Sequence, residues 1–162
     1  MPVHRKGAGL TVVIDTNILI SASEDDFNDA REVINLVIIG KVRALATRQI
    51  IDENKLLLKK RVVKKAVKQE LANYFNYVRL IRATSRERIV EEDREDDKFV
   101  HCALAASADF IITHDRHLLD IEKTGETEIV TPADFLARLK RREDPDGKNE
   151  WADWVKQLFG KQ

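Results

Sequence analysis

The chain reads Val12-Val13-Ile14-Asp15-Thr16-Asn17 and, later, Phe110-Ile111-Ile112-Thr113-His114-Asp115, two apolar runs that each lead to an Asp. Short runs of β-branched and aromatic residues predict buried strands. In an open α/β sheet, ligands bind outside the carboxyl ends of the parallel strands, so we expect both carboxylates at that edge. The two stretches therefore predict one acidic site, and an acidic site of this kind favours a metal ion.

Strand-like and helix-like segments alternate outward from these two stretches, a pattern typical of a mostly parallel sheet with helices on its faces. The predicted fold class is α/β, a three-layer α/β/α domain with a central sheet of about five strands. We expect strands over residues 11–14, 42–46, 78–81, 110–112 and 128–130, and helices over residues 29–39, 49–60, 62–74, 96–107 and 132–142.

The composition describes a single globular domain. The chain has 162 residues, of which 43% are hydrophobic and 35% charged, enough to bury one core. Basic and acidic residues both number 28, so any case for nucleic-acid binding must depend on local clusters. The one cysteine, Cys102, lies in an apolar helical stretch and is expected in the core. No apolar stretch approaches the roughly 18 residues of a membrane span, so we expect a cytoplasmic protein without membrane contact.

Three parts are expected along the chain: a basic segment over 1–9, the α/β domain over 10–142, and a polar linker with an amphipathic helix over 143–162. Apolar residues in the last part recur with helical spacing and include both tryptophans. Such a face either packs back on the domain or docks on a second copy or another protein. The residues of this face are Trp151, Trp154, Val155, Leu158 and Phe159.

Acidic residues stand at four places that could contribute to one site. They are Asp15, the pair Asp52 and Glu53, the run from Glu91 to Asp97, and Asp115. Helix capping and the helix dipole explain some of them, because Asp and Glu are favoured at helix N-termini. Six acids among the seven residues of the run exceed what capping needs, and their repulsion favours a cation. Mg²⁺ and Mn²⁺ prefer such oxygen ligands, whereas the His and Cys spacing of zinc sites is absent.

In order along the chain, these motifs resemble those of the PIN-domain nucleases. The opening Asp15-Thr16-Asn17, the Asp97 helix, the strand before Asp115 and the Thr131-Pro132 helix are similar to segments of that family over roughly residues 10–141. The resemblance implies four acidic positions, at Asp15, Glu53, Asp97 and Asp115, of which Asp15, Asp97 and Asp115 are the expected metal ligands. It implies supporting roles for Asn17, Thr113, Asp96 and Asp93.

The resemblance implies a ribonuclease that hydrolyses phosphodiester bonds with one or two Mg²⁺ or Mn²⁺ ions. It also implies the toxin of a toxin-antitoxin pair, with an antitoxin-type partner and a homodimer. The main alternative is a catalytically silent PIN-fold module that binds RNA or protein. A haloacid-dehalogenase-like phosphatase is a weaker alternative, since it would want a second Asp where Asn17 stands.

A basic stretch follows the proposed Glu53 position and is the candidate surface for RNA phosphates. Apolar residues interleave with it at helical spacing, so the same residues are also explained as the solvated face of an amphipathic helix. The candidate nucleic-acid-binding residues are Lys55, Lys59, Lys60, Arg61 and Lys64.

Overall fold

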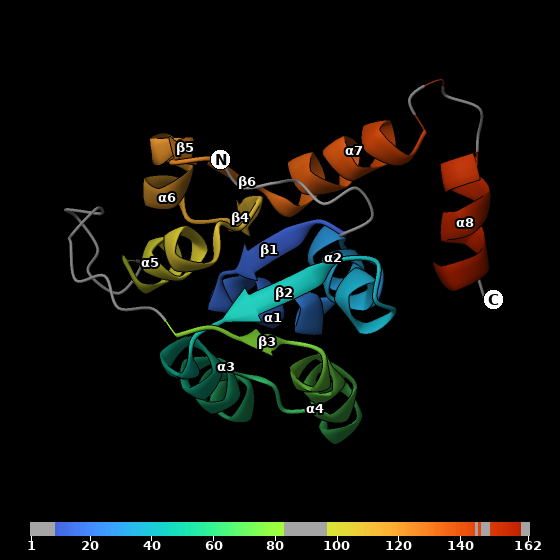
Figure 1. Ribbon diagram of the computed structural model, residues 1–162. Coiled ribbons are helices and arrows are strands. Elements are labelled where there is room, and N and C mark those ends of the chain that lie inside the picture. The colour runs from blue at the N-terminus through green and yellow to red at the C-terminus, as the bar shows by residue number, and fades with distance from the viewer. Residues whose placement is uncertain (1–8, 83–96, 145, 147–149, 160–162) are drawn as a thin grey trace.

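The computed structural model describes residues 9–82, 97–144, 146 and 150–159 (Figure 1). They form a three-layer α/β/α fold around a six-stranded sheet of order β3-β2-β1-β4-β6-β5. All neighbouring strands pair in parallel except β5 and β6. The strands are β1 (Thr11–Ile14), β2 (Arg43–Ala46), β3 (Arg79–Leu80), β4 (Phe110–Ile112), β5 (Lys123–Thr124) and β6 (Thr127–Val130).

The register of the two central strands brings their carboxyl ends together. Ile14 of β1 stands opposite Ile112 of β4, and the Asp15 N–H donates a 3.0 Å hydrogen bond to the Ile112 carbonyl. Strand β1 lies between β2 on one side and β4 on the other, so the strand order reverses at β1. In such sheets, ligands usually bind in the crevice at the carboxyl ends of the two strands where the order reverses, here β1 and β4.

The helices connect the strands and cover both faces of the sheet (Figure 1). Several begin with the side-chain caps that favour helix starts. Thr131 accepts a 3.2 Å hydrogen bond from the Asp134 N–H, with Pro132 in the first turn, as the sequence predicts. The helices are α1 (Thr16–Glu24), α2 (Asp29–Ile38), α3 (Arg48–Arg61), α4 (Lys65–Ala72), α5 (Asp97–Ala106), α6 (Arg116–Ile121), α7 (Pro132–Glu143) and α8 (Glu150–Phe159), with a 3-10 turn η1 (Asn73–Asn76).

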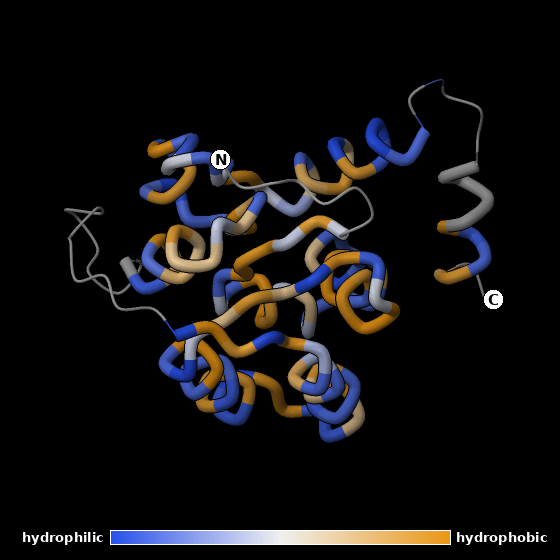
Figure 2. The backbone as a smooth tube through the Cα atoms, viewed as in Figure 1, coloured by the Kyte–Doolittle hydropathy of each residue, from blue (hydrophilic) through white to orange (hydrophobic). Residues whose placement is uncertain are grey.

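Successive side chains along each strand point to opposite faces of the sheet and pack into two separate hydrophobic cores. Val12 and Ile14 pack in the core under α1, α2 and α7, while Val13 packs in the core under α5 and α6. Figure 2 shows hydrophobic residues along the central strands and hydrophilic ones toward the outer end of α7. Strands buried on both faces explain why the strand stretches are continuously apolar rather than alternating.

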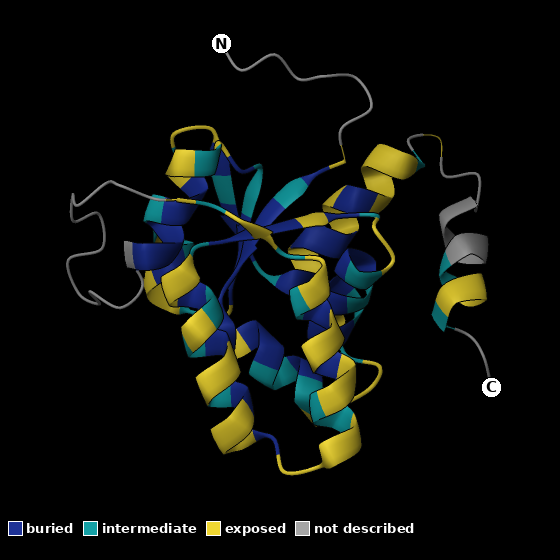
Figure 3. Ribbon diagram, turned by 60° about the horizontal axis from the view of Figure 1, so that its bottom comes forward, coloured by how far each residue is buried: buried dark blue, intermediate teal, exposed yellow. Residues whose placement is uncertain are grey.

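Helix α3 runs from one core to the other. Ile50 in its first turn packs with the α5 core, whereas Leu58 near its end packs with the α1 and α2 core. Beyond Leu58 the chain turns into α4, and exposed residues gather at the far ends of α3 and α4 (Figure 3). The first half of α3 is therefore close to the carboxyl edge of the sheet, and its basic last turn is remote from that edge.

The structure corrects one expectation and adds two short elements that were not predicted from the sequence. A single helix over 62–74 is wrong, because Val62 adopts an extended backbone that ends α3, α4 begins only at Lys65, and a 3-10 turn follows. The sheet has a sixth strand, the two-residue β5, which pairs with β6 through a tight turn at Gly125 with φ +58°. The six-residue α6, too short to show a clear period, follows Asp115.

The last part of the chain forms α8, as its helical spacing predicts. The side chains of residues 150–154, both tryptophans among them, lie outside the described residues, so the two alternatives for this face stay predictions, as does the division of the chain into three parts. Among the described helices, none has both the length and the apolar character that crossing a bilayer requires.

Candidate active site

Asp15 stands at the point where β1 ends and α1 begins. Its side chain is the N-cap of α1, with Oδ1 accepting a 3.1 Å hydrogen bond from the Asn17 N–H. Asp15 itself therefore caps this helix. Only 2% of the residue is exposed, so the carboxylate is almost completely removed from water.

Thr113 joins Asp15 to Asp115. The buried Thr113 hydroxyl donates a 2.7 Å hydrogen bond to Asp15 Oδ2 and accepts one of 2.9 Å from the Asp115 N–H. The Asp115 carboxylate in turn caps α6 by accepting a 2.8 Å hydrogen bond from the His117 N–H. The loops after β1 and β4 are thus tied together, and each holds one carboxylate at the same sheet edge.

The environment of Asp15 opposes its negative charge. Burial raises the pKa of this carboxyl above its usual value of 3.8, and the hydrogen bonds from Thr113 and Asn17 only partly offset that effect. The negative charges of Asp115 and Glu53 raise the pKa of Asp15 further. Three of the four predicted acidic residues therefore interact electrostatically, and a cation among them would relieve their repulsion.

Glu53 projects from the second turn of α3 and forms an ion pair with Lys98 of α5. The Glu53 side chain is 29% exposed, whereas that of Lys98 is only 6% exposed. A buried ammonium group needs such a partner, since an unpaired charge inside a protein is costly. Lys98 is a residue of the site that sequence reasoning missed, because a lysine inside a helical stretch gives no signal of its own.

A second missed contact fixes the position of α3. The Asn54 side-chain amide donates a 2.8 Å hydrogen bond to the Thr16 hydroxyl, and both residues are buried. This bond connects the second turn of α3 to the first turn of α1. Since Glu53 precedes Asn54 and Asp15 precedes Thr16, the bond keeps the backbone segments that carry these two carboxylates next to each other.

The remaining predicted site residues are described only in part. Asp97 is the first residue of α5, but its side chain lies outside the described residues, and Asp93 and Asp96 lie outside them altogether. Asn17 is exposed and contributes its backbone N–H to Asp15. The structure thus brings Asp15, Thr113, Asp115 and Glu53 together and gives no side-chain position for the fourth acid.

The chemistry of the described donors fits a hard divalent cation. Among the described side chains of residues 9–82 and 98–144, no group of three His, Cys, Asp or Glu is close enough to hold a metal by itself. The acids that interact at Asp15 are all oxygen donors, which suit Mg²⁺ or Mn²⁺ better than Zn²⁺. Asp97, which begins α5 beside Lys98, is the fourth acid that the resemblance implies.

The basic residues of the 55–64 stretch are all exposed, but they lie on different sides of α3. Lys55 extends over the Phe75 ring, 5.3 Å from its centroid, and so faces η1. Lys60 follows Glu53 by seven residues, which places it on the same face of the helix about 10 Å further along. Lys59, Arg61 and Lys64 stand at the far end of α3 and in the turn after it.

Cys102 is a core residue, as expected. It is fully buried against the sheet, and burial raises the pKa of its thiol to about 11. A thiol with so high a pKa is not ionised near neutral pH and cannot serve as a nucleophile.

Comparison with protein families gives a match to the PIN domain. The sequence profile of the PIN domain matches residues 11–117, two thirds of the chain and a range that contains Asp15, Glu53, Asp97 and Asp115. Comparisons with curated proteins and with solved structures give no match.

Proposed function

The chain belongs to the PIN-domain family, and from that premise we propose that it is a divalent-metal-dependent endoribonuclease that hydrolyses phosphodiester bonds in RNA. The observation that carries the proposal is the state of Asp15. This carboxylate is 2% exposed, is held by Thr113 and lies in the field of Asp115 and Glu53, which raises its pKa. A protein that only needed a helix cap there would not need two further carboxylates around it.

In this proposal Asp15, Asp97 and Asp115 are the ligands of one or two Mg²⁺ or Mn²⁺ ions. A bound divalent ion would supply a water of lowered pKa as nucleophile and would stabilise negative charge on the phosphate. Thr113 holds the Asp15 carboxylate by its hydrogen bond and is itself bound by the Asp115 N–H. Glu53 adds a fourth negative charge, and its ion pair with Lys98 holds it in place before an ion binds.

The test is cleavage of a mixed-sequence single-stranded RNA with Mn²⁺, with Mg²⁺ and with a chelator. We expect cleavage that requires the divalent ion and that is lost in folded Asp15→Asn and Asp97→Asn variants. Cleavage that persists in both variants, or in the presence of chelator, would overturn the proposal.

One observation favours the silent binding module as a second candidate. The Lys98 ammonium already neutralises Glu53, so this acid is engaged without any metal. If the chain is a silent module, RNA or protein binding persists in Asp15→Asn and divalent ions leave the thermal unfolding temperature unchanged. Metal titration followed by differential scanning calorimetry separates the two candidates, because ligands that bind only the folded state raise that temperature.

The proposal includes three finer points. The protein acts in the cytoplasm as the toxin of a toxin-antitoxin pair, an antitoxin-type protein blocks its acidic site, and two copies form a homodimer. Large apolar side chains exposed at Phe27, Val63 and Leu80 offer contact area for such partners. Growth arrest on expression, its relief by a neighbouring gene product, and the mass in solution by light scattering test these points separately.

A further inference from the structure

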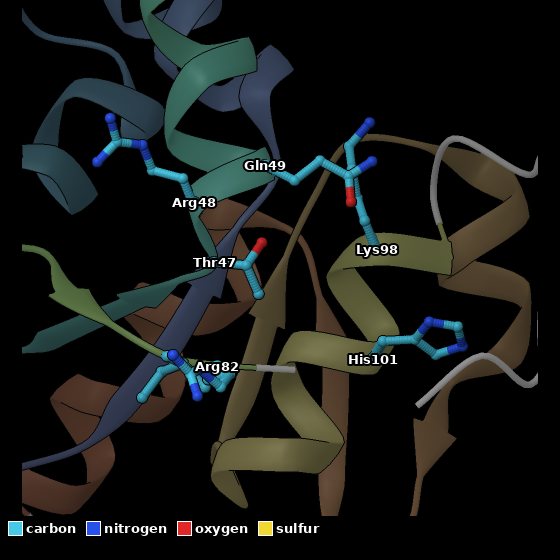
Figure 4. A pocket seen from close by; sticks show the side chains of 7 residues that line it. Thr47, Arg48, Gln49, Arg82, Lys98 and His101 are labelled. Carbon is cyan, nitrogen blue, oxygen red and sulfur yellow. The ribbon is translucent and has the colours of Figure 1, made fainter. Parts of the chain in front are cut away.

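A basic pocket lies beside the acidic site, at the ends of β2 and β3 (Figure 4). Its volume is about 290 Å³. Thr47 and the first residues of α3 follow β2, Ile81 and Arg82 follow β3, and α5 closes the other side. The lining residues are Thr47, Arg48, Gln49, Ile81, Arg82, Lys98 and His101.

The described residues that line the pocket favour an anion. Arg48, Arg82 and Lys98 are cationic, with Lys98 paired to Glu53, His101 adds an imidazole, and none of the described lining residues is acidic. Lys98 and His101 are three residues apart on α5 and therefore share one face of that helix. In Figure 4, the side chains of Gln49 and Lys98 point toward one another across the pocket.

The start of α3 adds partial positive charge to these side chains. Thr47 is the N-cap of this 14-residue helix, and its hydroxyl accepts a 3.3 Å hydrogen bond from the Ile50 N–H. The N–H groups of the first helical residues have no partner within the helix, and the helix dipole favours an anion at this end. Arg48 is less available, since it pairs with Asp52 at 3.3 Å and is largely exposed.

A chain of contacts connects the pocket to the acidic site. Lys98 lines the pocket and forms the ion pair with Glu53, and the Glu53 charge acts on Asp15. The pocket and the carboxylates also share the carboxyl edge of the sheet, because Thr47 follows β2 as Asp15 follows the neighbouring β1. Lys98 therefore lies between an anion in the pocket and the acidic residues.

We propose that this pocket binds a phosphate group of the RNA strand next to the phosphate that is cleaved. The proposal rests on the proposed ribonuclease function and deepens it, by naming where the strand is held. An acidic site repels a polyanion, so the strand needs a cationic contact close by, and the pocket supplies it closer to the acids than the far end of α3 does. Arg82, exposed and at the pocket wall, is the residue that such a phosphate contacts.

The first experiment measures binding of a fluorescein-labelled eight-nucleotide single-stranded RNA by anisotropy, in an Asp15→Asn background in which cleavage is removed. We expect Arg82→Gln to weaken binding roughly tenfold, the effect of losing one charge-assisted hydrogen bond. The slope of log K against log salt concentration should fall by about 0.7, the value for one phosphate contact on a single strand. Arg142→Gln, which removes an exposed arginine from the last turn of α7, is the matched control and should change neither quantity.

The second experiment replaces single phosphates of the same RNA by neutral methylphosphonates. One position should weaken binding to the Asp15→Asn protein and have no further effect on the Asp15→Asn, Arg82→Gln protein. Adding or removing a 5′-phosphate tells whether the phosphate is internal, as proposed, or the end of the strand, which would overturn the internal assignment.

The two proposals fail in different ways. If Arg82→Gln binds RNA as the Arg142→Gln control does, the pocket inference is overturned, while metal-dependent cleavage by the unmodified protein would leave the nuclease standing. If Arg82→Gln weakens binding but the unmodified protein never cleaves, RNA binding by the pocket stands, while the ribonuclease proposal and the assignment next to a cleaved phosphate fall.

Discussion

Asp15 and Thr113 are 98 positions apart in the sequence and share a buried hydrogen bond of 2.7 Å between the Thr113 hydroxyl and Asp15 Oδ2. The same hydroxyl accepts the 2.9 Å bond from the Asp115 N–H, so one small side chain connects two carboxylate-bearing loops. The Asp15 carboxylate is buried and lies near the negative charge of Asp115, which lowers the free energy of unfolding when no cation is bound. The consequences can be measured in the metal-free protein.

Replacing Asp15 by Asn should stabilise the metal-free protein near neutral pH. An Asp whose pKa is raised in the folded state binds its proton more tightly there than in the unfolded chain, so stability falls as pH rises from 3.8 to the folded pKa. Because Asn carries no charge, the stability of the variant does not fall over this pH range for that reason. Differential scanning calorimetry at pH 7 should show an unfolding temperature higher by about 2–4 °C, the shift that roughly 1 kcal/mol gives in a domain of this size.

The pH dependence of stability distinguishes the loss of the Asp15 charge from an effect of the substitution that does not depend on charge. The advantage of Asp15→Asn should vanish below pH 3.8, where Asp15 is protonated in both states. Asp120→Asn, at an exposed position of α6, is the control and should show no such trend. An Asp15→Asn variant less stable than the parent at every pH would contradict the argument.

Thr113→Val should destabilise the protein and shift its activity on the pH scale. Valine keeps the shape but removes the hydroxyl, leaving Asp15 Oδ2 and the Asp115 N–H without that partner, at about 1–3 kcal/mol per buried group. The Thr113 hydrogen bond lowers the pKa of Asp15, so its loss raises that pKa further in the metal-free protein. Protons then compete more strongly with the divalent ion for Asp15, and the acid limb of a cleavage profile moves to higher pH. Thr113→Ser keeps the hydroxyl and should restore both stability and profile; failure of Ser to do so would show that only packing matters.

Most of the fold was predictable, because strands buried on both faces are continuously apolar. The segments 11–14 and 110–112 match β1 and β4 to the residue, since each apolar run stops at a polar residue, Asp15 or Thr113. The prediction of one helix over 62–74 was wrong. Its apolar spacing continues that of α3, but Val62 adopts an extended conformation, with φ −97° and ψ 113°, that ends the helix. Strand β5 has two residues, too few for any period to appear.

The acidic residues of the candidate site were predictable from the sequence, but the residues that pair with them or position them were not. Asp15 and Asp115 follow strands whose ends must lie together, so their position follows from topology. Lys98 and Asn54 gave no signal, because their roles come from elements that meet only in three dimensions, α5 with α3 and α3 with α1. The basic pocket was missed for the same reason, since its residues come from three separate segments.

Removing the charge of Lys98 should make the protein depend more strongly on divalent ions. Lys98→Met leaves Glu53 without its ion-pair partner, and we expect a loss of about 1–3 kcal/mol, below the 3–5 kcal/mol of a fully buried pair because Glu53 is partly exposed. Added Mn²⁺ should then raise the unfolding temperature of the variant more than that of the parent, since the ion replaces the lost cation. Lys98→Arg keeps the charge and is the control; an equal Mn²⁺ response in all three proteins would contradict a role for Lys98 in balancing Glu53.

The two sides of α3 should differ in their effect on RNA binding. Lys60 lies on the helix face of Glu53, about 10 Å further along, so a strand leaving the acidic site on that side would pass it. Lys55 is directed to the Phe75 ring instead. Lys60→Gln should therefore weaken binding of single-stranded RNA about threefold at low salt and less at high salt, because exposed charges are screened. Lys55→Gln, an identical change in charge on the same helix, should leave binding within error; equal losses in both variants would mean that the basic stretch acts only through its total charge.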